Sequence, residues 1–346
     1  MELPALLVDL DRTEPPAPSP DVVVIGVAAR PRVVTGDFDV LLTRAPGAHR
    51  PWVSCADPHA AAEQLRKVVA DQPAAAITLV QVLRMGSVLL PRQRLIVESL
   101  AYSALQGGSG FRAWLSAARP RTHRPAAEPV RTRRDGDRLA VTLDRPWARN
   151  AFDAATRDAL CEALEVAVAD PSIARVDLYG RGPAFCGGGD LAEFGSSRDP
   201  AEAHRVRVHR SPAALLQRCG PKVTAHLHGA CVGAGIELPA FAGRVTSAPD
   251  TAIRLPEVSM GLIPGAGGTA SLPARIGRER TAYLALSGAA LTATEALCWG
   301  LIDGIAADWD DAAEAEPPLA PRRRHPRGFT ALSTASAIPR SPRSLG

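Results

Sequence analysis

Two glycine-rich turns in this chain could bind a negatively charged oxygen. The first contains Gly187–Gly189, and the second contains Gly233 and Gly235 between a predicted strand and an apolar predicted helix. Glycine lets main-chain N–H groups approach a ligand that a Cβ would keep away, and a helix start presents N–H groups without partners. Two such donors from separate turns, aimed at one point, would form an oxyanion hole.

Two glutamates stand beside these turns. Glu237 lies one turn into the helix after the second glycine turn, inside the apolar run Cys231–Phe241, and Glu257 follows twenty residues later. Exposure on the surface is the commoner fate of glutamate. A carboxylate inside an apolar run, however, needs a partner or a chemical task. Two carboxyl groups held close together divide their proton affinities, so that one can donate a proton while the other accepts one.

Other reactive side chains are predicted to be structural. Asp190 follows the first glycine turn, where an aspartate more often caps the next helix than acts as an acid. Cys186 has no histidine near it in the sequence to activate it as a nucleophile. The six cysteines are scattered without a C-x-x-C pair, and the eight histidines show no ligand spacing. We therefore expect reduced thiols and no metal site.

The second half of the chain has the pattern of a mostly parallel sheet covered by helices. Strands are predicted at 139–143, 175–179 and 223–227, and a helix opens at Asp153 as its N-cap and runs to about Val168. Each strand is followed by a turn and a helix, and the second and third of these turns contain the glycines. The elements thus place both glycine turns just after strands.

The chain divides into four predicted parts. Residues 1–119 form a small α/β region, residues 120–137 a Pro- and Arg-rich linker, residues 138–305 the catalytic domain, and residues 306–346 a Pro/Arg-rich tail expected to be disordered. The first part is predicted to hold strands at 21–28 and 39–43 and helices at 59–71, 75–84 and 95–105. It has no phosphate loop or acid pair, so we expect a packing, regulatory or partner-binding role for it.

Composition excludes several classes of protein. The 346 residues are 46% hydrophobic, enough to bury a large core, and no apolar stretch reaches the roughly 20 residues of a membrane-spanning helix. The net charge of +4 comes from the tail, because six arginines and no acids lie in residues 317–346. The rest of the chain is not basic, so we expect no nucleic-acid partner. The N-terminus lacks the pattern of a secretory signal, and we expect a cytoplasmic protein.

The segment from about Leu139 to Asp303 resembles the enoyl-CoA hydratase/isomerase, or crotonase, family. Five blocks stand in the family's order: LDRPWARNAF (143–152), GPAFCGGGDLAEF (182–194), HGACVGAGIEL (228–238), LPEVSMGLIPGAGGTASLPARIG (255–277) and LTATEALCWGLID (291–303). Five collinear blocks are far more specific than any one of them. The resemblance implies a crotonase-like ββα superhelix, here with the N-terminal α/β region and the disordered tail in addition.

The resemblance also implies residue roles. The N–H groups of Gly189 and Ala234 would hold the thioester oxygen of an acyl-CoA, and the N–H of Gly265 would help orient the attacking water. Glu237 and Glu257 match the acid/base pair of the hydratases, with Glu257 donating a proton to carbon and Glu237 activating water. Retention of both glutamates favours an enoyl-CoA hydratase. No metal and no cofactor are implied, because the substrate itself carries coenzyme A.

Two alternatives stay open. An isomerase would shift the double bond with one base, which leaves the second glutamate without a task. A non-catalytic, partner-binding scaffold is the other alternative, and the short C-terminus supports it. Family members usually continue past the position of Asp303 with helices that cover the acyl site and build a trimer, whereas 43 residues follow here. A homotrimer is therefore implied by the family but opposed by the missing helices, unless the N-terminal region supplies the cover.

Overall fold

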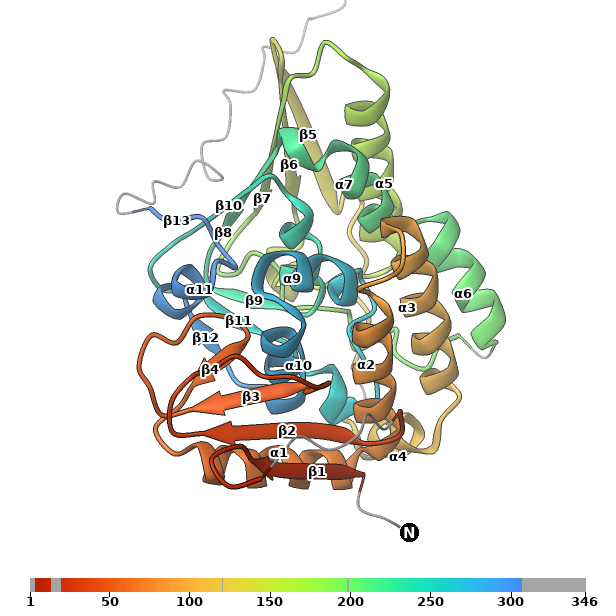
Figure 1. Cartoon of the computed structure of the whole chain (residues 1–346). Coiled ribbons are helices and arrows are strands. Elements are labelled where there is room, and N and C mark those ends of the chain that lie inside the picture. Colours follow the sequence, from red (N-terminus) through yellow and green to blue (C-terminus); the bar gives the residue numbers. More distant parts are fainter. Residues whose placement is uncertain (1–3, 14–19, 120, 198, 307–346) are drawn as a thin grey trace, which may run out of the picture. The chain divides into compact units, whose positions relative to one another are not determined.

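A four-stranded parallel sheet opens the chain. The structure is a computed structural model that describes residues 4–13, 20–119, 121–197 and 199–306 (Figure 1). The strands pair in the order β1-β2-β3-β4. Their bounds are β1 Ala5–Asp9, β2 Val23–Ala28, β3 Val40–Thr43 and β4 Trp52–Ser54. β2 and β3 are buried along their whole length, which explains their unbroken apolar sequences and confirms their prediction. β1 and β4 were not predicted.

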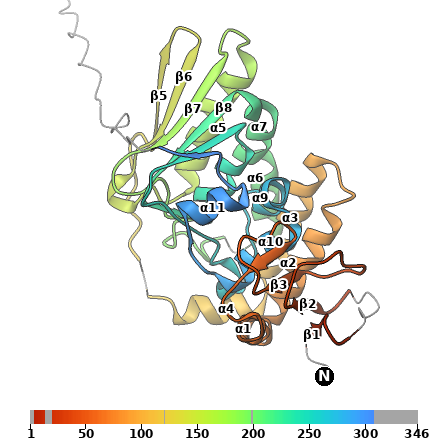
Figure 2. The ribbon, with the colours of Figure 1, turned by 60° about the vertical axis from the view of Figure 1, so that its left-hand side comes forward.

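Four helices follow this sheet. They are α1 Pro58–Asp71, α2 Pro73–Met85, α3 Pro91–Gln106 and α4 Ser109–Ala117. Asp57 caps α1 by accepting the N–H groups of His59 and Ala60, and a proline opens each of the first three helices. α1 packs on β1, β2 and β3, whereas α3 leaves the sheet and packs against α6 and α9 of the following part (Figures 1 and 2).

A six-stranded sheet carries the second part of the chain. Its order is β13-β10-β8-β7-β6-β5, and every neighbouring pair is parallel except β5 and β6. The bounds are β5 Val130–Asp135, β6 Arg138–Leu143, β7 Arg175–Gly180, β8 Val223–Leu227, β10 Arg244–Ser247 and β13 Gly304–Ile305. The predicted strands 139–143, 175–179 and 223–227 are confirmed, as is the mostly parallel arrangement.

The predicted linker is partly wrong. Within residues 120–137, β5 pairs along its whole length with β6 in an antiparallel hairpin, with Gly136 in the connecting turn. Its polar side chains misled the prediction, because β5 lies at the edge of the sheet and exposes five of its six residues. An edge strand needs few apolar side chains, since its backbone hydrogen bonds hold it in place. The predicted tail at 306–346 lies, apart from Ala306, outside the described residues.

Helices and a small third sheet complete the second part. The helices are α5 Ala154–Ala169, α6 Pro200–His209, α7 Pro212–Cys219, α8 Ala234–Glu237, α9 Gly268–Ile276, α10 Arg278–Ser287 and α11 Ala293–Trp299. The third sheet has the order β12-β11-β9, with β9 Ala230–Val232, β11 Ala252–Arg254 and β12 Leu291–Thr292. Asp153 caps α5 by accepting the N–H of Thr156, as predicted.

The two parts of the chain share one apolar core. A single cluster of buried side chains runs from β2 and α2 to β7, α9 and α10. The guanidinium of Arg280, on α10, donates to the carbonyl oxygens of Trp52 at 3.1 Å and Ala48 at 2.6 Å. The described residues also form one compact unit. The boundary predicted between 1–119 and 138–305 is therefore not a boundary of the core. Among the described helices, none is long and apolar enough to cross a membrane.

Candidate active site

Backbone hydrogen bonds join the two glycine turns. The N–H of Phe185 donates to His228 O at 3.0 Å, and the N–H of Val232 donates to Cys186 O at 3.0 Å. The contact is close because Gly235 faces Cys186, where a Cβ would overlap the carbonyl oxygen. The turns that follow β7 and β8 thus lie side by side, which is the arrangement that two converging donors require.

The amides of Gly189 and Ala234 are available to a ligand. Phe152 bonds to the residues on either side of Gly189, donating to Gly188 O at 2.7 Å and accepting from Asp190 N at 3.0 Å. Because the backbone alternates, the N–H of Gly189 points to the opposite side. Ala234 is the first residue of α8, so its N–H has no partner within the helix. Within the described residues, neither amide donates a backbone hydrogen bond, and both residues line the same cavity.

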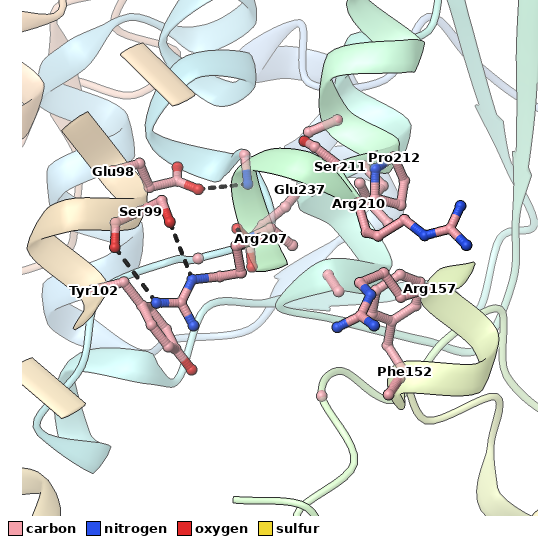
Figure 3. A pocket seen from close by; sticks show the side chains of 18 of the residues that line it. Glu98, Ser99, Tyr102, Phe152, Arg157, Arg207, Arg210, Ser211, Pro212 and Glu237 are labelled. Carbon is pink, nitrogen blue, oxygen red and sulfur yellow. Dashed lines mark hydrogen bonds between the residues drawn. The ribbon is translucent and has the colours of Figure 1, made fainter. Parts of the chain in front are cut away.

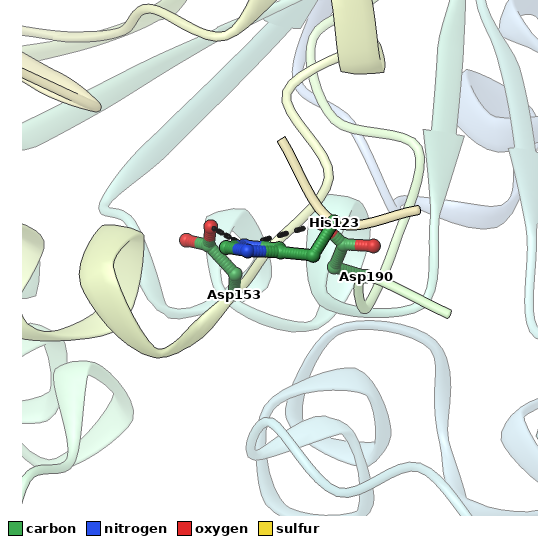
Figure 4. A group of neighbouring side chains, drawn as sticks. All are labelled: His123, Asp153 and Asp190. Carbon is green, nitrogen blue, oxygen red and sulfur yellow. Dashed lines mark hydrogen bonds and ion pairs between the residues drawn. The ribbon is translucent and has the colours of Figure 1, made fainter. Parts of the chain in front are cut away.

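An ion-pair cluster around the buried residues Arg145 and Asp153 holds the first turn in place; Figure 4 shows Asp153 with His123 and Asp190. The guanidinium of Arg145 is 2.9 Å from Asp153 Oδ2 and 3.0 Å from Asp190 Oδ2, and His123 Nε2 lies 2.9 Å from the same oxygen of Asp153. His123, Asp153 and Asp190 together have the donor types of a cation site. Arg145, however, already brings a positive charge to both aspartates. The cluster therefore reads as an anchor for the backbone beside Gly189.

Asp190 and Cys186 have structural contacts. Asp190 accepts the N–H of Ala192 at 3.0 Å, but the residues after it form turns, so the helix that it was predicted to cap is not there. Cys186 is buried, and burial raises the pKa of its thiol to about 12. A thiol with so high a pKa is a poor nucleophile. All six cysteines are free.

Glu237 is buried and tied to the start of α9. The residue is only 2% exposed, and its Oε2 accepts the N–H groups of Ala266 at 2.7 Å and Gly268 at 2.9 Å. Gly268 has to be glycine, because a Cβ there would stand 2.7 Å from Cγ of Glu237. Two N–H donors at a helix start favour the ionised carboxylate. Oε1 remains for a ligand.

Glu257 faces the same point as Glu237. A Cβ on Gly233 would overlap Oε1 of Glu257 and stand 3.7 Å from Oε1 of Glu237. Gly233 also has a φ of +51°, a conformation that favours glycine. Oε2 of Glu257 is buried and has no hydrogen-bond partner among the described residues. An orphaned buried carboxyl oxygen points to a missing ligand or to a bound proton.

Burial raises the pKa of both carboxyl groups. For Glu257, burial and repulsion from Glu98 raise the pKa to about 7. For Glu237, burial is the largest cause of a raised pKa, followed by repulsion from Glu257 and Glu98, while its two N–H donors act in the opposite direction. Because these charges repel one another, the pair holds a proton near neutral pH. The two carboxyl groups differ in their hydrogen bonds: Glu237 accepts two N–H donors that stabilise a charge, whereas Oε2 of Glu257 has no partner among the described residues.

α3 of the N-terminal region forms one wall of the cavity (Figure 3). The cavity has a volume of about 260 Å³, and α3 contributes Glu98, Ser99 and Tyr102 to its lining. Glu98 is 2% exposed and accepts the N–H groups of Gly267 at 2.7 Å and Thr269 at 2.8 Å. Glu237 and Glu98 therefore accept, in alternation, the four consecutive N–H groups of residues 266–269, which lead into α9. The N-terminal region supplies a cover for the site.

Tyr102 packs on the loop that contains Gly265. A Cβ on Gly265 would overlap the ring of Tyr102, so the glycine permits this close contact. Gly265 lines the cavity as predicted, and its proposed part in orienting water stays a prediction. No residue of 1–119 was predicted to lie in the site. A signal was present, because helical spacing sets Leu95, Glu98 and Tyr102 on one face and leaves an acid on an apolar face.

Comparisons with known proteins identify the family to which this chain is similar. The model of the enoyl-CoA hydratase/isomerase family matches residues 137–316. The mevalonyl-coenzyme A hydratase of Beauveria bassiana is 33% identical over 175 residues, and the 2,3-dehydroadipyl-CoA hydratase of Escherichia coli is 34% identical over 167 residues. The crystal structure of enoyl-CoA hydratase from Thermoplasma volcanium shares 33% identity over 53% of this chain and 73% of that chain, with a TM-score of 0.48.

The family match covers more than half of the chain, which therefore belongs to the enoyl-CoA hydratase/isomerase, or crotonase, family. This confirms the resemblance and the fold class inferred from the sequence. The matched segments take up 48% of this chain in both cases, and 62% and 65% of the lengths of the Beauveria and Escherichia relatives. The activity of the whole protein is accordingly a proposal.

Proposed function

We propose that this protein is an enoyl-CoA hydratase, which adds water reversibly to a 2-enoyl-CoA to give the 3-hydroxyacyl-CoA. The observation that carries the proposal is the convergence of four groups on one cavity: the free amides of Gly189 and Ala234 and the carboxyl groups of Glu237 and Glu257. Coenzyme A enters as part of the substrate, so the reaction needs no further cofactor. The names of both curated relatives describe hydratases acting on CoA thioesters, which supports the proposal.

The two amides would stabilise the charge that develops during the reaction. Addition of water at C3 of the enoyl thioester moves electrons toward the carbonyl oxygen and forms an enolate. N–H groups already fixed in place by the backbone pairing of the two turns need no reorganisation as this charge forms. Removal of one such donor in a hydrolase costs about 3–4 kcal/mol of barrier.

The two glutamates would move the protons. Glu237, ionised at the start of α9, takes a proton from the attacking water with its free Oε1. Glu257, which holds the proton of the pair, delivers it to C2 of the enolate. After the reaction Glu237 holds a proton and Glu257 a charge, and exchange with solvent restores the starting state. The opposite reaction, dehydration, uses the same groups in reverse.

Substitution of Glu257 tests this function. We expect Glu257→Gln to lower kcat for hydration by about 10²–10⁴-fold, because a positioned acid contributes that much. The assay follows loss of the enoyl-thioester absorbance. Glu63 is an exposed acid on α1 that does not line the cavity, so Glu63→Gln should keep the wild-type rate. Equal inactivity of wild type and Glu257→Gln on short, medium, branched and aryl enoyl-CoAs would favour the non-catalytic scaffold.

Isotope incorporation separates hydration from isomerisation. A hydratase working in H₂¹⁸O places the label in the 3-hydroxy group of its product. Migration of the double bond without uptake of the label would show an isomerase instead. Such an enzyme would depend strongly on Glu257 and weakly on Glu237, since one base suffices for it.

A further inference from the structure

Three arginines line the cavity. Arg157 lies in the first half of α5, Arg207 lies in α6, and Arg210 is the residue just after α6. Figure 3 shows Arg207 next to Tyr102, with Arg157 and Arg210 on the side away from α3. All three side chains are partly buried. The proposed reaction gives these arginines no task.

Arg207 contacts only neutral groups. Its guanidinium donates to Ser99 Oγ at 3.2 Å, to Gln106 Oε1 at 3.1 Å and to Ser103 Oγ, and it stacks over the ring of Tyr102 at 4.7 Å from the ring centre. Among the described residues, no carboxylate oxygen lies within 4.0 Å of it. Burial lowers the pKa of Arg207, whereas the nearby Tyr102 and Glu98 act in the opposite direction.

Arg157 and Arg210 share a single acid. Asp158 Oδ1 lies 2.9 Å from Nε of Arg157 and 3.7 Å from Nε of Arg210. Within the described hydrogen bonds, Arg157 uses only Nε, which leaves its terminal N–H groups free for a ligand. Among the described residues, Asp158 is the only acid in an ion pair with Arg157, Arg207 or Arg210, and we call these three arginines the arginine wall.

The arginine wall stands near the acyl end of a substrate. With the thioester oxygen at the Gly189 and Ala234 amides, C2 and C3 lie against the two glutamates, and the rest of the acyl chain continues beyond them. Arg207 stacks on Tyr102, and Tyr102 packs on Gly265, next to the amides that hold Glu237. The cavity between contains apolar surface from Leu95, Pro212, Ala213 and Leu238, suited to methylene groups.

We propose that Arg207 and Arg157 bind a carboxylate at the far end of the acyl chain, so that the preferred substrates are 2-enoyl-CoA thioesters with a terminal acid. This inference rests on the proposed hydratase function and specifies its substrate class. The guanidinium groups provide the charge and the N–H donors that a carboxylate accepts. The hydrocarbon part of the chain packs on the apolar surface between them and the glutamates.

The phosphates of coenzyme A are the other anions that a substrate brings. The pantetheine arm leaves the thioester on the side opposite to the acyl chain, and the phosphates lie at the far end of that arm. Arg207 instead lies one aromatic ring away from the loop beside Glu237. The geometry thus favours the acyl carboxylate over the phosphates.

The test compares two substrates of equal chain length, one with a terminal carboxylate and one with a terminal methyl group. We expect wild-type kcat/KM to be about 10- to 100-fold higher for the carboxylated substrate, as expected for a hydrogen bond to a charged group. Arg207→Gln and Arg157→Gln should each reduce this ratio, and Arg207→Lys should retain part of it. Because both substrates are measured on one preparation, the ratio does not depend on the fraction of folded enzyme.

A matched control lies on the same helix. Arg205 is exposed and pairs with Glu202 at 2.7 Å, outside the cavity, so Arg205→Gln should leave the ratio unchanged. The same pair of acyl groups on pantetheine, which lacks the phosphates of coenzyme A, separates the two anions. A carboxylate site keeps its preference on the pantetheine thioesters and loses it in Arg207→Gln.

Three results would contradict the carboxylate site, and they differ in what they imply for the hydratase function. If wild type hydrates both CoA substrates with nearly equal kcat/KM, the carboxylate site is ruled out and the hydratase function stands. An equal loss on both CoA substrates in Arg207→Gln that disappears on pantetheine thioesters would assign Arg207 to the phosphates. Absence of turnover on every enoyl-CoA would end the proposed function, and the inference with it.

Discussion

Gly233 brings the two proposed acid/base groups to one point by having no side chain. A Cβ on residue 233 would overlap Oε1 of Glu257, and that Cβ position is 3.7 Å from Oε1 of Glu237. The backbone at this position starts α8 and so also sets the direction of the Ala234 amide. One glycine thus controls both the oxyanion donor and the carboxylate pair.

We predict that Gly233→Ala lowers kcat/KM by at least about 100-fold, the lower range for loss of a positioned acid or base. The added methyl group displaces Glu257, while the positive φ adds strain. Gly136→Ala is the matched control, because its φ of +57° is nearly the same and no atom lies within 4 Å of the new Cβ. That control should lose about 1 kcal/mol of stability and no activity. Wild-type kcat/KM in Gly233→Ala would contradict this account of the site.

At the scale of elements, the start of α9 is shared by two acids from different parts of the chain. Glu237 of α8 takes the N–H groups of Ala266 and Gly268, and Glu98 of α3 takes those of Gly267 and Thr269. The helix start attracts negative charge, and each carboxylate satisfies donors that would otherwise be buried without a partner. The position of Glu237 therefore depends on the docking of α3.

This contact should weaken as the pH rises. Burial is the largest cause that raises the pKa of Glu98 from 4.5 to about 7, despite the opposing hydrogen bonds. A raised pKa means that the contribution of Glu98 to stability is complete below pH 4.5 and is lost as the pH rises through about 7. We predict that the free energy of unfolding falls more steeply with pH in wild type than in Glu98→Gln, by about 3 kcal/mol at most over this window.

Urea unfolding at several pH values measures this difference. Tyr102, Glu237, Glu257 and Arg207 also face Glu98 and remain in the variant, so the difference between the two curves reports Glu98 together with its effect on the titration of these groups. Glu63→Gln, on the exposed side of α1, should give a curve parallel to wild type. Parallel curves for Glu98→Gln and wild type would show that Glu98 has no raised pKa in the folded protein.

At the scale of the whole described molecule, the N-terminal sheet and the six-stranded sheet share one core. Leu79 of α2 is fully buried and belongs to the same cluster as Leu178 of β7 and Leu272 of α9. Arg280 adds polar contacts between the two parts through the carbonyl oxygens of Ala48 and Trp52. A shared core makes separate unfolding of either part costly.

We predict that Leu79→Ala destabilises both parts together, by about 2–5 kcal/mol, as for other large-to-small changes in a core. Native-state hydrogen exchange should show equal losses of protection for amides in β2 and in β7. Val33→Ala, a fully surface-exposed apolar site, serves as the control with little change. Loss of protection confined to β1–β4 would mean that the N-terminal region unfolds independently.

The sequence alone was sufficient for the buried strands, for several helices and for the family. Apolar runs such as β2 and the N-cap at Asp153 are local signals, because a strand's burial and a helix's start are written in neighbouring residues. The ordered blocks around Gly189 and Glu237 identified the two turns, since the chemistry of close backbone approach needs glycine at fixed positions. These local requirements survive in a single sequence.

Only the tertiary structure brought α3 and the arginine wall into the cavity. Glu98 and Gly267 are separated by 169 positions, and Arg207 meets Ser99 across 108. Such contacts depend on how helices pack, which local propensity and spacing do not specify. β5 was mistaken for a linker for a related reason: its place in the sheet comes from backbone pairing with β6, and backbone hydrogen bonds leave no mark in the side chains.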